Sequence, residues 1–117
     1  MVKSSEYDLD LIFQALADPT RRAMLKSLSR HERAVTELAE PFDMSLVAAS
    51  KHVKVLERAG LVNRRRQGAF SYVSLNARAM KSADAWLNYY RKFWEQSLDR
   101  LDQYLQEMKK KEAEEKP

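Results

Sequence analysis

The sequence predicts a mainly α-helical fold with one small β-hairpin, and three observations lead to this prediction. Residues 35–59 hold two helical patterns separated by a short turn. Residues 61–75 hold two strand-like runs around a basic turn. A stripe of apolar residues at helical spacing then extends over residues 78–110. Helix, turn, helix and charged hairpin in this order are typical of a winged helix-turn-helix, followed here by a long C-terminal helix.

Length and composition fit one soluble domain. The chain has 117 residues, of which 44% are apolar and 32% charged, as in ordinary globular proteins. No apolar run approaches the ~18 residues that span a membrane, and the polar N-terminus lacks a signal-peptide pattern. We therefore expect a single domain over residues 1–117, a cytoplasmic location and no contact with a membrane.

Positive charge is concentrated in the middle of the chain. The whole sequence carries 21 Lys and Arg against 17 Asp and Glu, whereas residues 44–76 carry six against one. A basic segment that coincides with a helix and a hairpin is the electrostatic pattern of a nucleic-acid-binding protein. Double-stranded DNA is the expected partner.

Two helices are predicted ahead of the helix-turn-helix. The first covers about residues 8–17, on the apolar positions Leu9, Ile12, Phe13 and Leu16. Asp18 is a suitable N-cap and Pro19 a suitable first residue, so the second helix should begin there and end near residues 29–31. Its predicted apolar face is formed by Ala23, Met24 and Leu28, with Leu25 adjacent.

The next two helices and the hairpin have clear boundary residues. Pro41 should end or distort the short third helix, which holds Val35, Leu38 and Ala39. Ser45 is the predicted N-cap of the fourth helix, which runs to about residue 59 and closes at Gly60. Gly68 supplies the backbone freedom that the hairpin tip needs.

The C-terminal stripe predicts an interface. It is widened by aromatic residues and needs a partner, because a core of under ~80 residues cannot cover so long an apolar surface. Partial packing on its own domain combined with dimerisation is favoured over self-packing alone. The residues expected at a homodimer interface come from the first and last helices: Leu9, Ile12, Phe13, Leu87, Tyr90, Trp94, Leu98, Leu101 and Leu105.

The fourth helix is the expected reading helix, because an α-helix on a rigid scaffold fits the major groove of DNA. Serine and lysine side chains suit bases and phosphates, and small apolar side chains suit thymine methyl groups. Of the residues in the first turn of this helix, Val47 and Ala48 are the most expected to face the core instead of DNA. The candidate DNA contacts on the helix are Ser45, Leu46, Val47, Ala49, Ser50, Lys51, His52 and Lys54.

The basic turn adds Arg64, Arg65, Arg66 and Gln67 to the candidate DNA contacts. Residues two apart on a strand share a face, so Arg64 and Arg66 should lie on one side and Arg65 on the other. At least one of these arginines should reach a phosphate or the minor groove beside the docked helix. The alternative is a solvated basic turn.

Three runs carry a family resemblance: LADPTRRAMLKSL at 16–28, TELAEPFDMSLVAASKHVKVLERAGLV at 36–62 and RRRQGAFSYVSLN at 64–76. They resemble the ArsR-type winged-helix family of bacterial transcriptional regulators, and the similarity covers roughly residues 9–105. The resemblance implies a homodimer joined through its first and last helices. It also implies a fourth helix in the major groove and repression from a palindromic operator.

The sequence departs from the metal-sensing branch of that family. The stretch that would carry two cysteines in the third helix is residues 37–43, and the chain has no cysteine at all. The other known metal site of that family uses Asp and His on the last helix. Here the last helix has Asp84 but no histidine, and His31 and His52 are the only histidines in the sequence. No metal or cofactor is expected. If the chain responds to an inducer, that inducer is an unidentified small molecule rather than a thiol-bound metal.

Catalysis is not expected. The chain has no cysteine nucleophile, no GxSxG motif and only two glycines, which excludes a phosphate-cradling glycine-rich loop. The leading hypothesis is a dimeric, operator-specific repressor. The alternative is a winged-helix protein-interaction module that does not bind specific DNA sequences.

Overall fold

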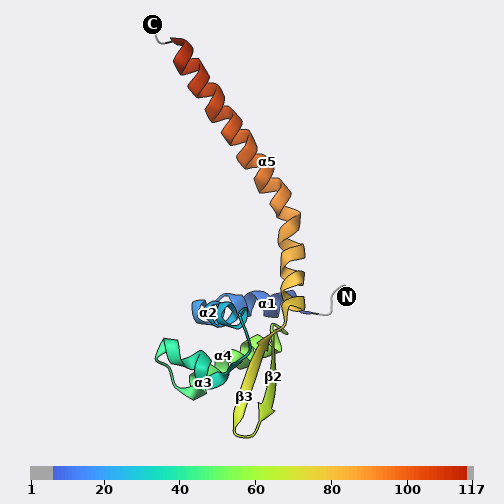
Figure 1. The fold of residues 1–117 in the computed structure, drawn as a ribbon. Coiled ribbons are helices and arrows are strands. Elements are labelled where there is room, and N and C mark those ends of the chain that lie inside the picture. The colour runs from blue at the N-terminus through green and yellow to red at the C-terminus, as the bar shows by residue number, and fades with distance from the viewer. Residues whose placement is uncertain (1–6, 116–117) are drawn as a thin grey trace. The chain divides into compact units, whose positions relative to one another are not determined.

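The computed structural model describes residues 7–115 and divides into two compact units, one up to Ala83 and one from Asp84 onward. Each unit is described by itself. The first contains four α-helices, a short 3-10 helix and a three-stranded sheet, and the second consists of the greater part of one long helix (Figure 1). The predicted fold class, mainly helical with a β-hairpin wing, is confirmed.

Helices α1 (Leu9–Leu16) and α2 (Pro19–Leu28) are connected by side chains that hydrogen-bond the free backbone groups at their adjoining ends. Asp18 Oδ2 accepts the Arg21 backbone N–H at 3.0 Å and so caps α2, as predicted. The Arg21 guanidinium donates back to the carbonyls of Ala15 and Gln14 at 2.8 and 2.9 Å, at the end of α1. These bonds fix the corner between the two helices.

One prediction for α2 was wrong. Ala23 is exposed, and the buried face consists of Met24, Leu25 and Leu28. The helix ends at Leu28, one residue before the predicted range of 29–31, and Ser29 is its C-cap.

The helix-turn-helix comprises α3 (Val35–Ala39) and α4 (Leu46–Arg58). Pro41 ends α3 as predicted, and residues 40–42 continue as a 3-10 helix, η1 (Glu40–Phe42). Asp43 follows in the left-handed region with φ 49°, which Asp tolerates better than most residues. Ser45 then caps α4, and its Oγ accepts the Ala48 N–H at 3.1 Å.

The C-terminus of α4 is a Schellman motif centred on Gly60. Leu61 N–H donates to Leu56 O at 3.0 Å and Gly60 N–H donates to Glu57 O at 2.9 Å, while Gly60 itself has φ 78°. Asn76 secures this corner, because its side chain donates to Gly60 O at 2.8 Å and its N–H to Leu61 O at 2.8 Å. The predicted role of Gly60 is confirmed.

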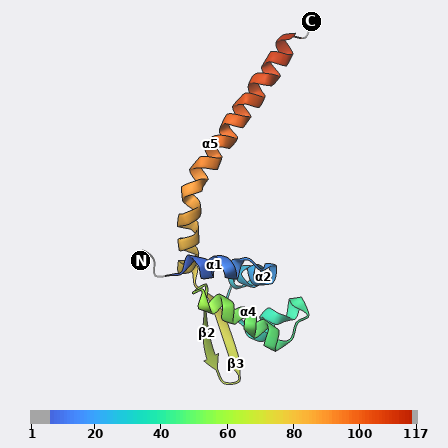
Figure 2. The ribbon, with the colours of Figure 1, turned by 180° about the vertical axis from the view of Figure 1, so that it is seen from behind.

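The sheet has the order β1-β3-β2 and is antiparallel throughout. Strands β2 (Val62–Gln67) and β3 (Phe70–Leu75) form the predicted hairpin, hereafter the wing, with Gly68 at φ 61° in its tip. Strand β1 (Arg33–Ala34) was not predicted, because two residues carry no recognisable pattern. Figure 2 shows the wing from behind, below α1 and α2 and beside α4.

The core of the first unit is built from every one of its helices and from the sheet. Its largest fully buried side chains are Ile12, Met24, Leu38, Val53, Leu56, Leu61, Val62 and Val73. No polar or charged residue among residues 7–115 is buried. The core therefore supplies a rigid apolar platform on which α4 and the wing are held.

Helix α5 (Ala77–Glu115) is longer than predicted and contributes to both units. Ala79 and Ala83 belong to the core of the first unit. From Asp84 to Glu115 every residue is exposed. No helix between residues 7 and 115 is long and apolar enough to cross a membrane.

Candidate nucleic-acid interface

The outward face of α4 carries both apolar and polar side chains. Leu46 and Val47 are 54% and 66% exposed, and Ser45, Lys51 and Lys54 are also exposed. Large apolar side chains so open to water at the start of a helix fit contact with another molecule. The expectation that Val47 faces the core was wrong, while Ala48 is partly buried.

Ala49 is a second correction. Its side chain is completely buried in the core, so it has no surface to offer to DNA. The reason is helical phase, since Ala49, Val53 and Leu56 fall on the inward face of α4. Ser50, one residue on, is partly exposed.

His52 lies against α2 rather than in open solvent. Its Nδ1 is 3.3 Å from Arg21 Nη1 and 4.0 Å from Asp18 Oδ2. The hydrogen bond from the Arg21 N–H lowers the pKa of Asp18, and the charges of Arg21 and His52 lower it further against the opposing effect of burial. His52 therefore connects α4 to the N-terminus of α2.

The three consecutive arginines of β2 separate onto two faces, as the strand period predicted. Arg64 and Arg66 line the side that faces α4, and Arg65 lies on the other. The Arg64 side chain is largely covered, with Nη2 3.4 Å from Ser50 O and Nε 3.9 Å from Glu57 Oε1. Its buried Nε has no hydrogen-bond partner among the described residues. Arg66 is exposed.

On the other face of the wing, Arg65 contacts Glu32 and Tyr72, and these three residues are hereafter called the clamp. Its Nη2 and Nε donate to the two carboxylate oxygens of Glu32 at 2.6 and 3.1 Å, and its guanidinium lies 4.7 Å from the centre of the Tyr72 ring. The Arg65 hydrogen bonds lower the pKa of Glu32, and the same contacts raise the pKa of Arg65. Gln67 Oε1 accepts a further bond from Arg65 at 2.6 Å.

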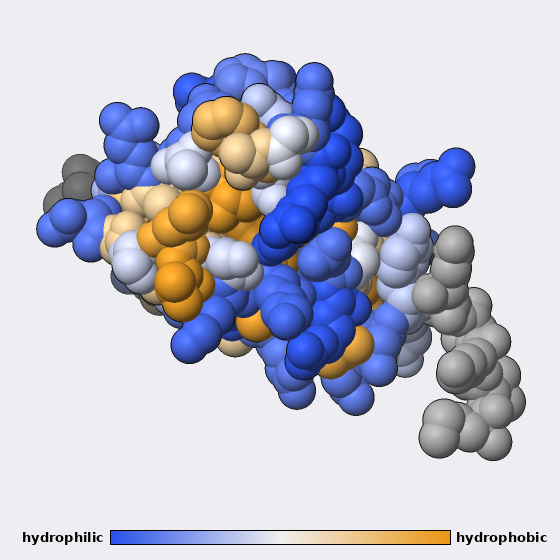
Figure 3. All heavy atoms as spheres, turned by 90° about the horizontal axis from the view of Figure 1, so that it is seen from below, coloured by the Kyte–Doolittle hydropathy of each residue, from blue (hydrophilic) through white to orange (hydrophobic). Residues whose placement is uncertain are grey.

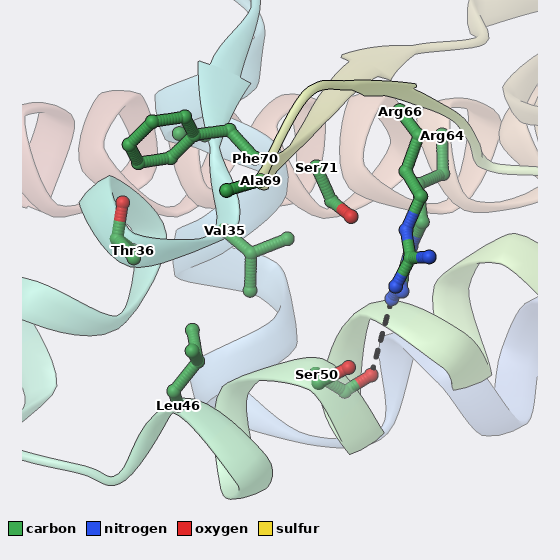
Figure 4. Close-up of a pocket in the computed structure, with 10 residues that line it drawn as sticks. Val35, Thr36, Leu46, Ser50, Arg64, Arg66, Ala69, Phe70 and Ser71 are labelled. Carbon is green, nitrogen blue, oxygen red and sulfur yellow. Dashed lines mark hydrogen bonds between the residues drawn. The ribbon is translucent and has the colours of Figure 1, made fainter.

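An open pocket of about 210 Å³ lies between α3, α4 and the wing. In the close-up of Figure 4, Arg64 and Arg66 reach down from β2 toward the turn of α4 that carries Ser50, and Leu46 and Phe70 lie on the other side. Viewed from below in Figure 3, the molecule shows hydrophobic side chains beside strongly hydrophilic ones. The pocket therefore joins the predicted reading helix to the predicted wing.

Sequence reasoning missed several residues of this surface, among them Phe70 and Thr36. Phe70 is 53% exposed at the start of β3, and Thr36 is exposed at the start of α3. In the sequence, Phe70 stands only as part of the second strand-like run of residues 61–75. Its position directly after the wing tip is the signal that could have marked it as a surface residue.

Comparisons with known proteins agree with this architecture. Residues 16–65 match a family model described as a helix-turn-helix domain. The transcriptional repressor SdpR of Bacillus subtilis is 34% identical over 76 residues, which cover 65% of this chain and 84% of that protein. A solved ArsR family transcriptional regulator is 44% identical with a TM-score of 0.70, covering 74% of this chain and 90% of that one. HlyU from Vibrio cholerae is 28% identical with a TM-score of 0.57, covering 70% of this chain and 89% of that one.

The chain belongs to the ArsR family. This membership makes it a DNA-binding transcriptional regulator and not an enzyme. It belongs to the members of the ArsR family without the cysteine metal-sensing motif, because the sequence contains no cysteine. Between residues 7 and 115, no three His, Asp or Glu side chains lie where they could hold a metal ion together.

The residues predicted at an ArsR-type dimer interface have different surroundings. Ile12 is completely buried in the core of its own chain and offers no surface to a second copy, so its assignment is corrected. Leu9 and Phe13 are partly buried. The six predicted residues of α5 are all exposed: Leu87, Tyr90, Trp94, Leu98, Leu101 and Leu105.

Proposed function

We propose that this ArsR-family protein is a homodimeric repressor that binds a palindromic operator in bacterial cytoplasm. Helix α4 lies in the major groove, and the 64–68 segment of the wing lies on the phosphate backbone or in the minor groove. The observation that carries the proposal is the juxtaposition of an exposed α4 N-terminus with the exposed guanidinium of Arg66 in the most basic part of the chain.

The exposed residues of α4 have separable roles in this proposal. Leu46 and Val47 meet base edges and thymine methyl groups, because they are apolar and lie in the first turn. Ser45, Ser50, Lys51 and Lys54 hydrogen-bond bases or phosphates. His52 positions α4 against Asp18 and Arg21 instead of reading a base.

Dimerisation through α5 is supported by its uncovered apolar side chains. Leu98 and Leu101 are 59% and 53% exposed, and the aromatic residues before them are exposed as well. A patch of this length on a folded chain marks an interface. Two copies related by a two-fold axis would present two copies of α4 to successive turns of DNA.

Salt dependence of DNA binding tests the proposal. Neutralising Z phosphates gives a slope near −0.9Z in a plot of log affinity against log salt, so six to eight contacts per dimer should give a steep line. A flat response with genomic and random DNA alike would contradict the proposal and favour the protein-interaction alternative.

Selection of bound fragments from genomic DNA tests the operator. We expect the recovered fragments to share one two-fold symmetric site. Leu46→Ala should change the preferred bases within that site, since an apolar contact with a base edge is lost. Recovery of fragments that share no symmetric sequence would contradict a dimeric reader.

A further inference from the structure

We infer that the pocket between α3, α4 and the wing binds a small organic anion with an apolar body, a class of ligand exemplified by an aromatic carboxylate. The pocket lies wholly within the first unit. Binding of the anion there is independent of the proposed function, whereas its regulatory consequence rests on that function.

One half of the pocket is cationic and rich in hydroxyl groups. Arg64 and Arg66 line it together with Ser50 and Ser71, and Ser71 faces Arg66 across the β2–β3 pair. Arg64 keeps a buried Nε without a hydrogen-bond partner among the described residues, and Glu57 is its nearest carboxylate at 3.9 Å. Arg66 has no ion pair within residues 7–115. Two guanidinium groups beside hydroxyl groups suit a carboxylate, which accepts bidentate bonds.

The other half is apolar. Val35 and Ala69 line it, and Leu46 and Phe70 flank it with more than half of each side chain open to water. Inorganic phosphate would use only the cationic half of the pocket. An apolar body beside the anionic group would also cover Leu46 and Phe70, which is favourable in proportion to the area removed from water.

The size of the pocket restricts the ligand. Its volume of about 210 Å³ is smaller than the ~300–1,000 Å³ of pockets that bury drug-sized ligands. A single aromatic ring with one carboxylate is therefore the appropriate scale. Roughly millimolar affinity is expected for such a fragment in an open site.

The ligand would compete with DNA. Leu46, Ser50 and Arg66 line the pocket and are also proposed DNA contacts. One surface cannot hold both partners, so the anion lowers DNA affinity and DNA lowers anion affinity by the same factor. This gives the regulator a means of release that requires neither a metal ion nor cysteine.

Binding is tested by titrating the isotope-labelled full chain in the absence of DNA with benzoate, acetate, benzamide and inorganic phosphate at constant ionic strength. The amide signals of Ser50 and Ser71 report on the pocket. We expect benzoate to bind about tenfold more tightly than acetate, which lacks the ring, and benzamide, which lacks the charge. Equal affinity for phosphate and benzoate would overturn the proposal, since the apolar half would then contribute nothing. Absence of signal changes at the pocket would overturn it as well.

Two exposed positions and one matched control locate the site. Arg66→Gln should weaken benzoate binding about tenfold by removing a charge-assisted contact, and Phe70→Ala should weaken it about fivefold. Arg65→Gln removes the same charge from the same strand on the opposite face and should change benzoate affinity by less than about twofold. Equal losses in both arginine variants would indicate nonspecific attraction and contradict the site.

A DNA titration keeps the two proposals apart. If benzoate binds and displaces an operator duplex more effectively than acetate, the regulatory inference holds. Benzoate binding without displacement would overturn the competition. If no duplex is bound even without benzoate, the proposed DNA function fails, while the result for the pocket stands on the DNA-free titration.

Discussion

Contacts of single residues connect the end of α4 to the start of α5 in the first unit. Asn76 joins the end of α4 to the start of α5, because its side chain bonds Gly60 O and accepts the Arg78 N–H at 3.3 Å. Its Nδ2 also lies 3.2 Å from the Tyr7 hydroxyl. Tyr7 packs so closely on Gly60 that a Cβ there would lie 2.7 Å from its ring. This corner has no room for a larger residue.

Comparing Gly60→Ala with Gly68→Ala measures that restriction. Both positions have positive φ, which costs an alanine about 1 kcal/mol or more, but nothing lies within 4 Å of a Cβ at Gly68. We expect a loss of unfolding free energy of about 1 kcal/mol for Gly68→Ala and about 3 kcal/mol for Gly60→Ala, where the Tyr7 ring must also move. Urea denaturation provides the values. Equal losses in the two variants would show that the Tyr7 contact has no energetic effect.

Asp18 gives a pH-dependent contribution whose sign is fixed by its environment. Its folded-state pKa is lowered, so the ionised form stabilises the fold above the unfolded pKa, and this contribution disappears as pH falls through the folded pKa. Asp18→Asn keeps a good N-cap and removes the titration. The stability difference between wild type and Asp18→Asn should be constant near neutral pH and shrink below about pH 4. Thermal denaturation across this range checks it, and a difference independent of pH would contradict the assignment.

Predictions from sequence at this scale reached local contacts but not distant ones. Ser45 and Asp18 were predictable as N-caps because a cap side chain bonds to a backbone N–H two or three positions away. The DNA contact of His52 stays a prediction, whereas its contacts with Asp18 and Arg21, more than 30 positions earlier in the chain, were not predicted. No local pattern could reveal that contact.

At the scale of elements, the wing has two chemically different faces. Its α4 side carries Arg66 and the pocket, and its other side carries the clamp of Arg65, Glu32 and Tyr72. The alternation was predictable because a strand has a period of two. The clamp was not, because Glu32 and Arg65 are 33 positions apart and meet only through the sheet.

The two faces predict unequal effects on DNA binding. Arg66→Ala should weaken binding to all sequences and reduce the magnitude of the salt slope by about one per altered contact, since an available phosphate contact is removed. Arg65→Ala should change the slope much less, because Arg65 already has a carboxylate partner. Fluorescence anisotropy at several salt concentrations distinguishes the two. Equal slopes for both variants would contradict the division of roles.

At the scale of the whole molecule, the proposed function depends on a second copy of the chain. The C-terminal stripe was predicted from its helical spacing, and α5 does form one helix to Glu115. The assignment of Ile12 to the interface failed because the hydrophobic pattern of a short helix does not separate core residues from interface residues.

Charged substitutions in the apolar stripe of α5 should dissociate the proposed dimer. Leu98→Asp combined with Leu101→Asp places two carboxylates where the partner would pack, and burying unpaired charge is unfavourable. We expect light scattering to give a mass near 13.7 kDa, the value of one chain, at concentrations where the wild type is dimeric. Gln103→Asp, about 200° around the helix from Leu101, should leave the mass unchanged. A monomeric wild type, or a doubly substituted variant that remains dimeric, would contradict the interface.

The Glu32–Arg65 ion pair has a consequence for selectivity. A phosphate that binds Arg65 competes with a carboxylate of the protein itself, so in the proposed complex this arginine contributes less than a free one to the release of cations condensed on DNA. The wing thereby carries less indiscriminate attraction for duplex than its three arginines would give if all were free. In the proposed function, affinity for arbitrary sequences falls while the proposed contacts of α4 with base edges are unchanged, which favours a regulator that searches a genome full of competing sites.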